Sequence, residues 1–294
     1  MVRSSTSRSV LGPRAAGKTA GAAVGVLAGV VSLTLLSGCS GAAKAAPTGP
    51  TLPPVLQGDP THVVTAAAGR TTTAPNANVA ISVPVVAESG PTNVNGEGAV
   101  DFVGDRTKLI VPNAEKAEER QIGRAVYVLL PEQAAPMLGG KQWVKLDLDK
   151  VGPKSPDPFN LYAFAPEQLV TALTAVRDAH LVGSEPVRDA NTTHFTGTLD
   201  PRAVAAAGVD PTFARYVAAA TKGAPMSVDV WLDDTGLIRK LSIPLPPPGA
   251  TTPAPPATVE LFDFGTADVS FTPPPADKVA SQADLDSLGA GSGD

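Results

Sequence analysis

Apolar and polar residues alternate with a period of two in many segments of the chain. In segment 79–85, VAISVPV, valine or isoleucine occupies every second position. This period predicts β-strands that bury one face. Because proline has no backbone N–H to donate, Pro84 predicts an edge strand or a bulge at this point. The same alternation predicts further strands at 100–102, 109–111, 143–148, 193–199, 226–232, 237–243 and 258–264.

One segment departs from the alternation, because residues 125–130, AVYVLL, are apolar on both faces. A strand of this kind must be covered on both sides. Between the strands expected at 226–232 and 237–243 lies the sequence Asp233-Asp234-Thr235-Gly236. A short turn that ends in glycine fits a β-hairpin, with Gly236 at positive φ.

A different period marks segment 166–178, PEQLVTALTAVRD, which predicts a helix. Pro166 suits the first helical turn, and the Glu167 carboxylate suits its positive end. Leu169, Leu173 and Val176 form one apolar stripe along this helix. Two shorter helices are expected at 201–207 and 211–221, with Gly208 as the stop between them.

These elements predict an α+β fold, because short strands and tight turns surround helices that are bunched in the middle. Such an order favours a curved antiparallel sheet with helices packed on its concave side. Segment 244–257, PLPPPGATTPAPPA, separates two of the strands and predicts a polyproline-like loop within the fold.

The start of the chain has the layout of a secretory signal. Residues 1–18 carry four basic residues and no acid, residues 19–36 carry no charge, and Ser37 and Gly38 are small. Leu36-Ser37-Gly38-Cys39 resembles a bacterial lipobox. The resemblance implies a diacylglyceryl group on Cys39 and cleavage between Gly38 and Cys39. A retained transmembrane helix remains an alternative, since 18 residues is the lower limit for a span. A cysteine incidental to an ordinary cleavage site is another.

Composition divides the rest of the chain. Segment 39–59 is rich in proline, alanine and glycine and predicts a tether, 60–278 the folded domain, and 279–294 a disordered tail. Without segment 1–38 the chain has 19 basic and 28 acidic residues, a net charge of −9. An acidic body argues against nucleic acid as a partner. We therefore expect membrane attachment through the lipid anchor, on the outer face of the cytoplasmic membrane in the cell envelope.

Motifs that carry catalysis or metal binding are not evident in the sequence. No G-x-S-x-G motif occurs, and His62, His180 and His194 lie far apart. Asp233 and Asp234 are adjacent, so on a strand they point to opposite faces, and a role as turn formers is favoured. We expect no catalytic residue, no metal and no cofactor.

Two segments of the chain resemble a known family. The segment VDVWLDDTGLIRKLSI, 228–243, is similar to the LppX/LprG-type lipoproteins of actinobacteria, which have a LolA/LolB-like fold. Segment 180–200 carries the same resemblance, a strand with Val182-Gly183, Glu185 and Val187, then a polar turn and a second strand. Its matching residues in that second strand and at its end are Thr193-His194-Phe195, Gly197 and Asp200. The chain departs from the family at the proline insert 244–257 and at Arg188, where glycine is frequent.

The resemblance implies a half-open β-barrel around a hydrophobic cavity, and some members carry acylated lipids or glycolipids. It therefore predicts a lipid or glycolipid ligand within an apolar cavity. Plain core packing is the alternative for each side chain, and a structural or partner-docking lipoprotein without a lipid ligand is the alternative for the whole. The candidate lining residues are Val79, Ile81, Val83, Leu109, Val126, Val128, Leu169, Leu173, Val228, Val230, Leu232, Leu241, Ile243 and Phe262.

Overall fold

The structure, a computed structural model, describes residues 52–87, 90–111, 117–149, 165–246, 253–281 and 284. The predicted signal segment, Gly38, Cys39 and most of the tether lie outside the described residues, as does most of the predicted tail. The described fold extends beyond the expected domain, 60–278, at both ends. A 3₁₀ turn, η1 (Pro54–Leu56), precedes it, and strand β12 (Val279–Ala280) follows it.

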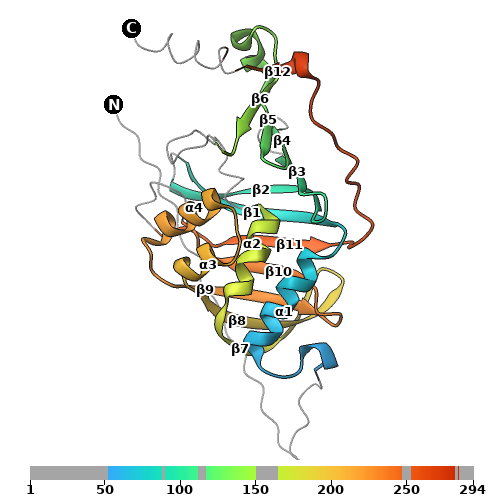
Figure 1. The fold of residues 1–294 in the computed structure, drawn as a ribbon, viewed down its shortest axis with the longest axis vertical. Helices are drawn as coiled ribbons and strands as arrows, with labels where there is room; N and C mark the ends of the chain where they lie inside the picture. Colours follow the sequence, from blue (N-terminus) through green and yellow to red (C-terminus); the bar gives the residue numbers. More distant parts are fainter. Residues whose placement is uncertain are drawn as a thin grey trace, which may run out of the picture. The chain divides into compact units, whose positions relative to one another are not determined.

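All strands of the described residues belong to one twelve-stranded sheet, in the order β12-β6-β5-β4-β3-β2-β1-β11-β10-β9-β8-β7. Every neighbouring pair is antiparallel except β12 with β6. The outermost strands, β12 and β7, do not pair, so the sheet is curved but unclosed (Figure 1). The other strands are β1 (Ala77–Ala87), β2 (Gly90–Asp101), β3 (Arg106–Val111), β4 (Ala117–Ile122), β5 (Ala125–Leu129), β6 (Trp143–Asp147), β7 (Arg177–Val187), β8 (Ala190–Leu199), β9 (Met226–Asp233), β10 (Ile238–Ile243) and β11 (Ala257–Phe262).

Three of the four α-helices in the described segments begin at an Asp-Pro pair. The side chains of Asp59, Asp200 and Asp210 each accept a hydrogen bond from a backbone N–H of the following turn. The proline that follows each cap fits the first turn, where an N–H would have no partner. The α-helices are α1 (Pro60–Thr72), α2 (Pro166–Ala172), α3 (Pro201–Ala206) and α4 (Pro211–Thr221), and the further 3₁₀ turns are η2 (Glu132–Leu138), η4 (Leu173–Ala175) and η5 (Ala276–Lys278).

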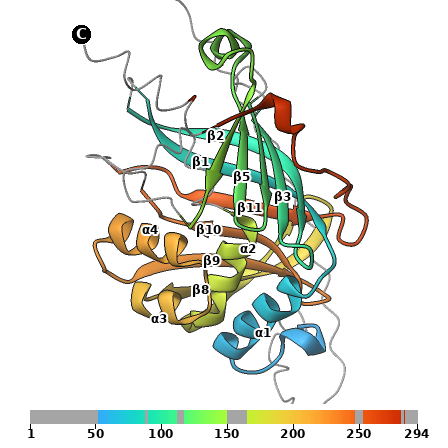
Figure 2. The same ribbon diagram turned by 45° about the horizontal axis from the view of Figure 1, so that its top comes forward.

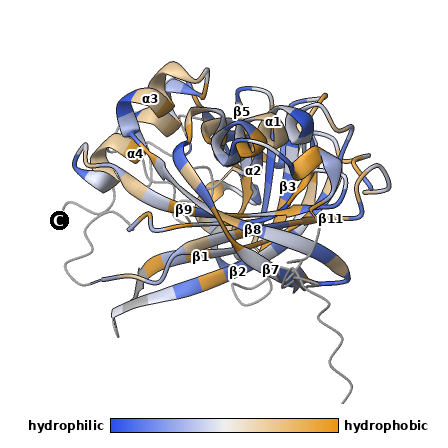
Figure 3. Cartoon of the chain, turned by 90° about the horizontal axis from the view of Figure 1, so that it is seen from below, coloured by the Kyte–Doolittle hydropathy of each residue, from blue (hydrophilic) through white to orange (hydrophobic). Residues whose placement is uncertain are grey.

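Helices and sheet form two layers. Figure 3 shows the four α-helices on one side of the strands β1, β2, β7, β8, β9 and β11. We call the side of the sheet that faces the helices the inner face, and the opposite side the outer face. The predicted α+β fold, a curved antiparallel sheet with helices on its concave side, is confirmed.

The sheet bends sharply beyond β2. Strands β4–β6 are seen nearly edge-on in Figure 1, whereas Figure 2 shows β3 and β5 broadside. At Gly98, before the bend, β2 approaches β3 closely, and a Cβ atom there would lie 1.7 Å from the Lys108 carbonyl oxygen of the neighbouring strand. Only glycine allows the two backbones to approach this closely.

Several predicted elements are confirmed with shifted bounds, and the hairpin at 233–236 is present with Gly236 at φ 78°. The prediction for helix 166–178 was too long, since α2 ends at Ala172 and the chain continues through η4 into β7. A 3₁₀ turn that leads into a strand also buries apolar residues spaced by three and four. The spacing therefore did not show where the helix ends. The β7–β8 hairpin implied by the resemblance is present, with its turn at Arg188 and Asp189.

The prediction of an edge strand or a bulge at Pro84 holds only locally, since the β1–β2 ladder has no bulge and β1 as a whole is not an edge strand. β1 lies within the sheet, between β2 and β11. Its ladder with β11 ends at Ser82, however, so Pro84 pairs with Asn93 of β2 and has no β11 partner. The proline therefore lies where β1 has a neighbour on one side only, which is the local condition that its missing N–H requires.

Candidate functional site

The inner face of the sheet is apolar across five adjacent strands. Antiparallel register places Ile81, Val259, Leu241, Val230 and Phe195 opposite one another, from β1 through β11, β10 and β9 to β8. Residues that pair directly share a face of the sheet. All five are buried, with at most 3% of the residue exposed. A continuous hydrocarbon surface therefore runs beneath the helices.

Three separate parts of the chain cover this surface. Leu169 and Leu173 come from α2 and η4, Val64 from α1, and Phe213 and Val217 from α4, all in one buried cluster with the sheet residues. No strand of a second sheet takes part in this cover among the described residues. The cover therefore contacts the apolar strands mainly by side chains and not by a backbone ladder.

The fourteen candidate lining residues fall into three groups. Most of them lie in this main cluster, whereas Val126 and Val128 form a smaller cluster with Leu148 and Ala165. The members in the main cluster are Val79, Ile81, Val83, Leu109, Leu169, Leu173, Val228, Val230, Leu232, Leu241 and Ile243. Their burial fits both roles that the sequence left open, because acyl-binding cavities and ordinary cores use the same side chains.

Phe262 was placed wrongly by the sequence. It pairs with Asn78 on the outer face, and its neighbour Leu261 is buried on the inner face. The Arg188 guanidinium lies 3.8 Å from the centre of the Phe262 ring and donates to Glu260 at 2.8 Å. Because two apolar residues stand in succession, the sequence alone did not fix which one faces inward.

Polar side chains interrupt the inner face at β3 and β4. Thr107, Glu119 and Gln121 are at most 5% exposed. Thr107 Oγ1 donates to Glu167 Oε2 at 3.1 Å, which joins β3 to the first turn of α2. Burial of Glu167, with a smaller contribution from Asp105, raises the pKa of its carboxyl to about 7. This carboxyl therefore exchanges a proton near neutral pH.

Charged groups tie the turn after β4 to the helices. Arg124 forms an ion pair with Asp210, the cap of α4, and a second one with Asp149 at 2.9 Å. The Asp210 backbone N–H donates to Gln168 Oε1 of α2 at 2.7 Å. Arginine thus neutralises the buried Asp210 carboxylate where strands and helices meet.

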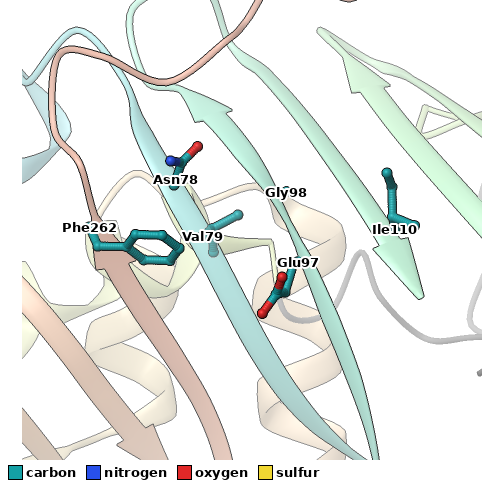
Figure 4. Close-up of a pocket in the computed structure, with 6 residues that line it drawn as sticks. All are labelled: Asn78, Val79, Glu97, Gly98, Ile110 and Phe262. Carbon is teal, nitrogen blue, oxygen red and sulfur yellow. The ribbon is translucent and has the colours of Figure 1, made fainter. Parts of the chain in front are cut away.

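A shallow depression of about 410 Å³ lies on the outer face (Figure 4). The register places Asn78, Glu97, Ile110 and Phe262 on this face, and Val79, which belongs to the inner-face register, also lines the depression. Gly98 completes the lining. Apolar walls with one carboxylate and one amide suit a contact with a peptide or another small surface.

A second outer-face cluster surrounds Trp231. It lies on the outer face but is only 8% exposed. His194 stacks on its ring with centroids 4.2 Å apart, Lys240 lies 4.7 Å from its ring centre, and its Nε1 donates to Glu185. These neighbours cover the indole, so it is a packed element of the sheet surface.

The part of the chain that the structure describes holds no group of three or more His, Cys, Asp or Glu residues that would suit a metal ion. His62 and His180 lie on the surface, and His194 bonds to Asp229 at 3.0 Å. None of the helices in the described segments has the length and apolarity needed to cross a bilayer.

Sequence reasoning missed two features of these sites. Glu167 was interpreted only as a favourable helix start, because nothing in the sequence shows its contact with Thr107 sixty residues away. The contact between Arg188 and Phe262 was missed for the same reason. Both depend on which strands become neighbours.

No family model matches the sequence. Among solved structures, LprF from Mycobacterium bovis is similar, with 15% identity, a TM-score of 0.41, and coverage of 73% of this chain and 95% of that one. The lipoprotein LppX from Mycobacterium tuberculosis gives 14% identity, a TM-score of 0.39, and coverage of 71% and 97%. A LolA superfamily protein from Nitrosomonas europaea gives 12% identity, a TM-score of 0.28, and coverage of 69% and 92%. These likenesses concern the fold alone.

Two curated sequences are also similar. "Putative lipoprotein SCO4650" of Streptomyces coelicolor is 26% identical over 166 residues, which cover 54% of this chain and 50% of that protein. An uncharacterized 31.2 kDa protein of Streptomyces griseus is 31% identical over 124 residues, which cover 39% and 41%. The chain thus spans half or less of the length of these relatives.

Proposed function

We propose that this chain is a lipoprotein of the cell envelope that binds an acylated lipid or glycolipid between the inner face of its sheet and its helices. In this proposal, segment 1–38 is removed and Cys39 carries the lipid. The chain from Cys39 to the start of the fold is the tether, and the domain stands on the outer face of the cytoplasmic membrane. Binding and carriage of the lipid require no catalysis.

The apolar inner face carries the proposal. Five strands present a continuous hydrocarbon surface, and its cover consists of helices from separate parts of the chain. Such helices are able to move away from the strands without breaking a backbone ladder. An acyl chain that takes the place of the helices contributes a favourable free energy of about 0.8 kcal/mol for each CH₂ group that it buries.

The lipid anchor has separate support. The lipobox-like sequence at Cys39 contains the only cysteine of the chain. The Streptomyces coelicolor relative is named as a putative lipoprotein. A diacylglyceryl group supplies two acyl chains, which hold a protein stably at a membrane, whereas one chain does not.

The first experiment tests the anchor. Wild-type protein should partition with membranes and carry a diacylglyceryl mass on an N-terminal Cys39, as measured by mass spectrometry. Cys39→Ser should keep the uncleaved mass or appear in the soluble fraction without lipid. An unmodified Cys39 in the mature wild type would contradict the anchor.

The second experiment tests the ligand. The domain from residue 50 onward, expressed without the anchor in an actinobacterial host, is extracted with organic solvent, and the extract is analysed by mass spectrometry. We expect acyl lipid in proportion to protein. The same protein, unfolded and refolded without lipid, is the control and should take up a fluorescent fatty-acyl probe. A clean extract from folded protein, together with no uptake of the probe, would contradict the proposal.

The outer-face depression favours a second candidate function, a partner-docking lipoprotein without a lipid ligand. Ile110 lines the depression and is 38% exposed. A photo-crosslinking residue at position 110 should then capture a discrete protein in cells. Val103, which is 74% exposed in the turn after β2, provides the matched control position. Equal labelling from both positions would remove this candidate.

A further inference from the structure

Strand β7 carries two adjacent apolar side chains on the surface of the sheet edge. Leu181 is 46% exposed and Val182 is 54% exposed. Leu181 pairs with Phe195 of β8, and Val182 is the residue that the register shift leaves without a partner in β8. Most residues of β7 are exposed. In the described segments, β7 pairs with β8 alone. The apolar pair therefore projects from an uncovered edge.

The backbone of this edge is poorly suited to pair with a further strand. The register between β7 and β8 shifts twice, between Arg177 and His180 and between Leu181 and Gly183. Such irregularities twist an edge away from a flat template. Pro186 also removes one backbone donor. A second copy added as a strand is therefore an unfavourable occupant of this site.

The edge lies close to the point where the tether joins the fold. The Ala179 backbone N–H donates to Thr61 Oγ1 at 3.0 Å, which fixes the start of α1 against β7. Figure 1 shows α1 beside β7, at the other end of the sheet from β12. Leu52, the first described residue, is nine positions before Thr61.

The tether is short enough to keep this edge near a bilayer. Residues 39–51 are thirteen residues, and a chain of that length spans at most about 45 Å when fully extended. As a flexible coil its average end-to-end distance is roughly 20 Å. The surface around the start of α1 therefore stays within a few tens of ångströms of the lipid anchor.

Charge and backbone chemistry set the kind of contact. The body is acidic, so attraction to anionic lipid does not hold it. An open sheet edge is not tolerated in hydrocarbon, but the headgroup region supplies water and lipid oxygens to its N–H groups. Leucine and valine at this depth bury apolar surface at the boundary of the acyl chains.

We propose that Leu181 and Val182 rest in the interfacial region of the bilayer, so that the β7 edge is a second membrane contact of the anchored protein. The proposal rests on the anchor at Cys39. If the β7 edge contacts the membrane in this way, then β12 and β6 lie at the edge of the sheet farthest from the membrane.

The test uses the cysteine content of the chain. With Cys39 alkylated, Val182→Cys supplies the only free thiol, to which an environment-sensitive fluorophore is attached. Met137→Cys is the matched control, because Met137 is 66% exposed in η2, which joins β5 to β6 at the far edge. Both full-length lipidated variants are reconstituted into phosphatidylcholine vesicles, with and without phosphatidylglycerol. Leu181→Cys replaces Val182→Cys if circular dichroism shows that the latter is misfolded.

We expect the label at position 182 to become about two- to threefold brighter on vesicles and to be quenched by spin-labelled lipid, and the label at 137 to stay unchanged. Flotation with the vesicles reports the anchor separately. If both variants float but their labels respond alike, the docking proposal is overturned and the anchor stands. If neither variant floats with the vesicles, both the anchor and the docking of the β7 edge are contradicted. A response at 182 that depends on protein concentration without vesicles would show self-association and would also overturn the docking.

Discussion

The strands beneath the helices and the strands at the β6 end of the sheet differ in what they bury. Strands β8–β11 and β1 present only apolar side chains inward along the row from Ile81 to Phe195. Strands β4–β6 bury Glu119 and Gln121 together with a cluster of four residues. We call these two regions the helix-covered strands and the arm.

The two regions are also held in different ways. Helices pack on the inner face of the helix-covered strands, whereas segment 267–275 crosses the outer face near the arm. There the Thr272 carbonyl accepts from Arg120 at 2.7 Å, and the Arg120 guanidinium lies 4.8 Å from the centre of the Trp143 ring. One continuous sheet therefore has a part with a purely apolar inward row covered by helices and a part that buries polar side chains.

The largest expected effect is at the junction of the two regions. Gly98→Ala places a Cβ atom 1.7 Å from the Lys108 carbonyl oxygen, so β2 and β3 have to separate. We expect a loss of roughly 3–5 kcal/mol in the free energy of unfolding, measured by urea denaturation. Gly183→Ala, which meets no atom within 4 Å, is the control and should change stability little. Equal effects would show that the close approach is not needed.

The second prediction compares the loss in free energy of unfolding when one leucine is removed from each region. Leu241→Ala empties a site in the main cluster and should cost about 3 kcal/mol, because Leu→Ala changes in cores leave a cavity. Leu146→Ala, in a partly buried position beside the smaller cluster, should cost about 1 kcal/mol. Urea denaturation measures both. A larger loss at Leu146 would contradict the distinction between the regions.

The third prediction concerns pH. The pKa of Glu167 is raised from 4.5 to about 7 by burial, so the folded state holds its proton more tightly than the unfolded state. The stability that this proton contributes is fully present below pH 4.5 and is lost as the pH rises to 7. The full loss is roughly 3 kcal/mol, at 1.36 kcal/mol for each unit of pKa.

Glu167→Gln should remove this slope and make the protein more stable than wild type above pH 7. Unfolding curves at several pH values between 4 and 8 measure it. Asp268, which is fully exposed, offers a control, since Asp268→Asn should leave the slope in this range in place. Parallel profiles of wild type and Glu167→Gln would refute the role of Glu167.

The fourth prediction concerns segment 267–275. Phe271 is 9% exposed and lies 5.8 Å from Arg106 and 6.0 Å from Lys108, measured from its ring centre. Phe271→Ala should cost about 1–2 kcal/mol and should raise hydrogen exchange in β3 and β4. Exchange in β8–β10 should stay unchanged. A uniform rise across the sheet would show that the two regions unfold as one.

Much of the helix-covered strands followed from the sequence, because their buried faces alternate cleanly. The sequence also predicted that Gly208 ends the first of two short helices, and Gly208 has φ 84° between α3 and α4. The Pro84 expectation failed for β1 as a whole, since a local chemical rule does not say where a partner strand ends. The Asp-Pro pairs that cap three helices were present in the sequence, yet α1 was not predicted, because alanines and threonines give it a weak apolar stripe.

In the arm, β5 and β6 were predicted at 125–130 and 143–148, whereas β4 and the start of β2 beside the arm were missed for a physical reason. β4, AEERQI, has no apolar alternation, since its inward positions are Ala117, Glu119 and Gln121. The first half of β2, GPTNVNGEG, resembles a loop because glycine and asparagine disfavour strands. Polar residues in these strands are stabilised by neighbours far away in the chain. A pattern within one segment does not contain that information.

Strand β1 lies near the middle of the sheet, but one of its two neighbours, β11, is made last among the long strands. Asn78 Nδ2 donates to Asp263 Oδ2 at 3.0 Å across 185 positions of sequence. Pairings so distant in sequence form slowly. A chain that is exported from its N-terminus, as we propose, therefore remains without its central ladder until residue 262 has emerged. The topology thus delays the central pairing until the last long strand has been translocated.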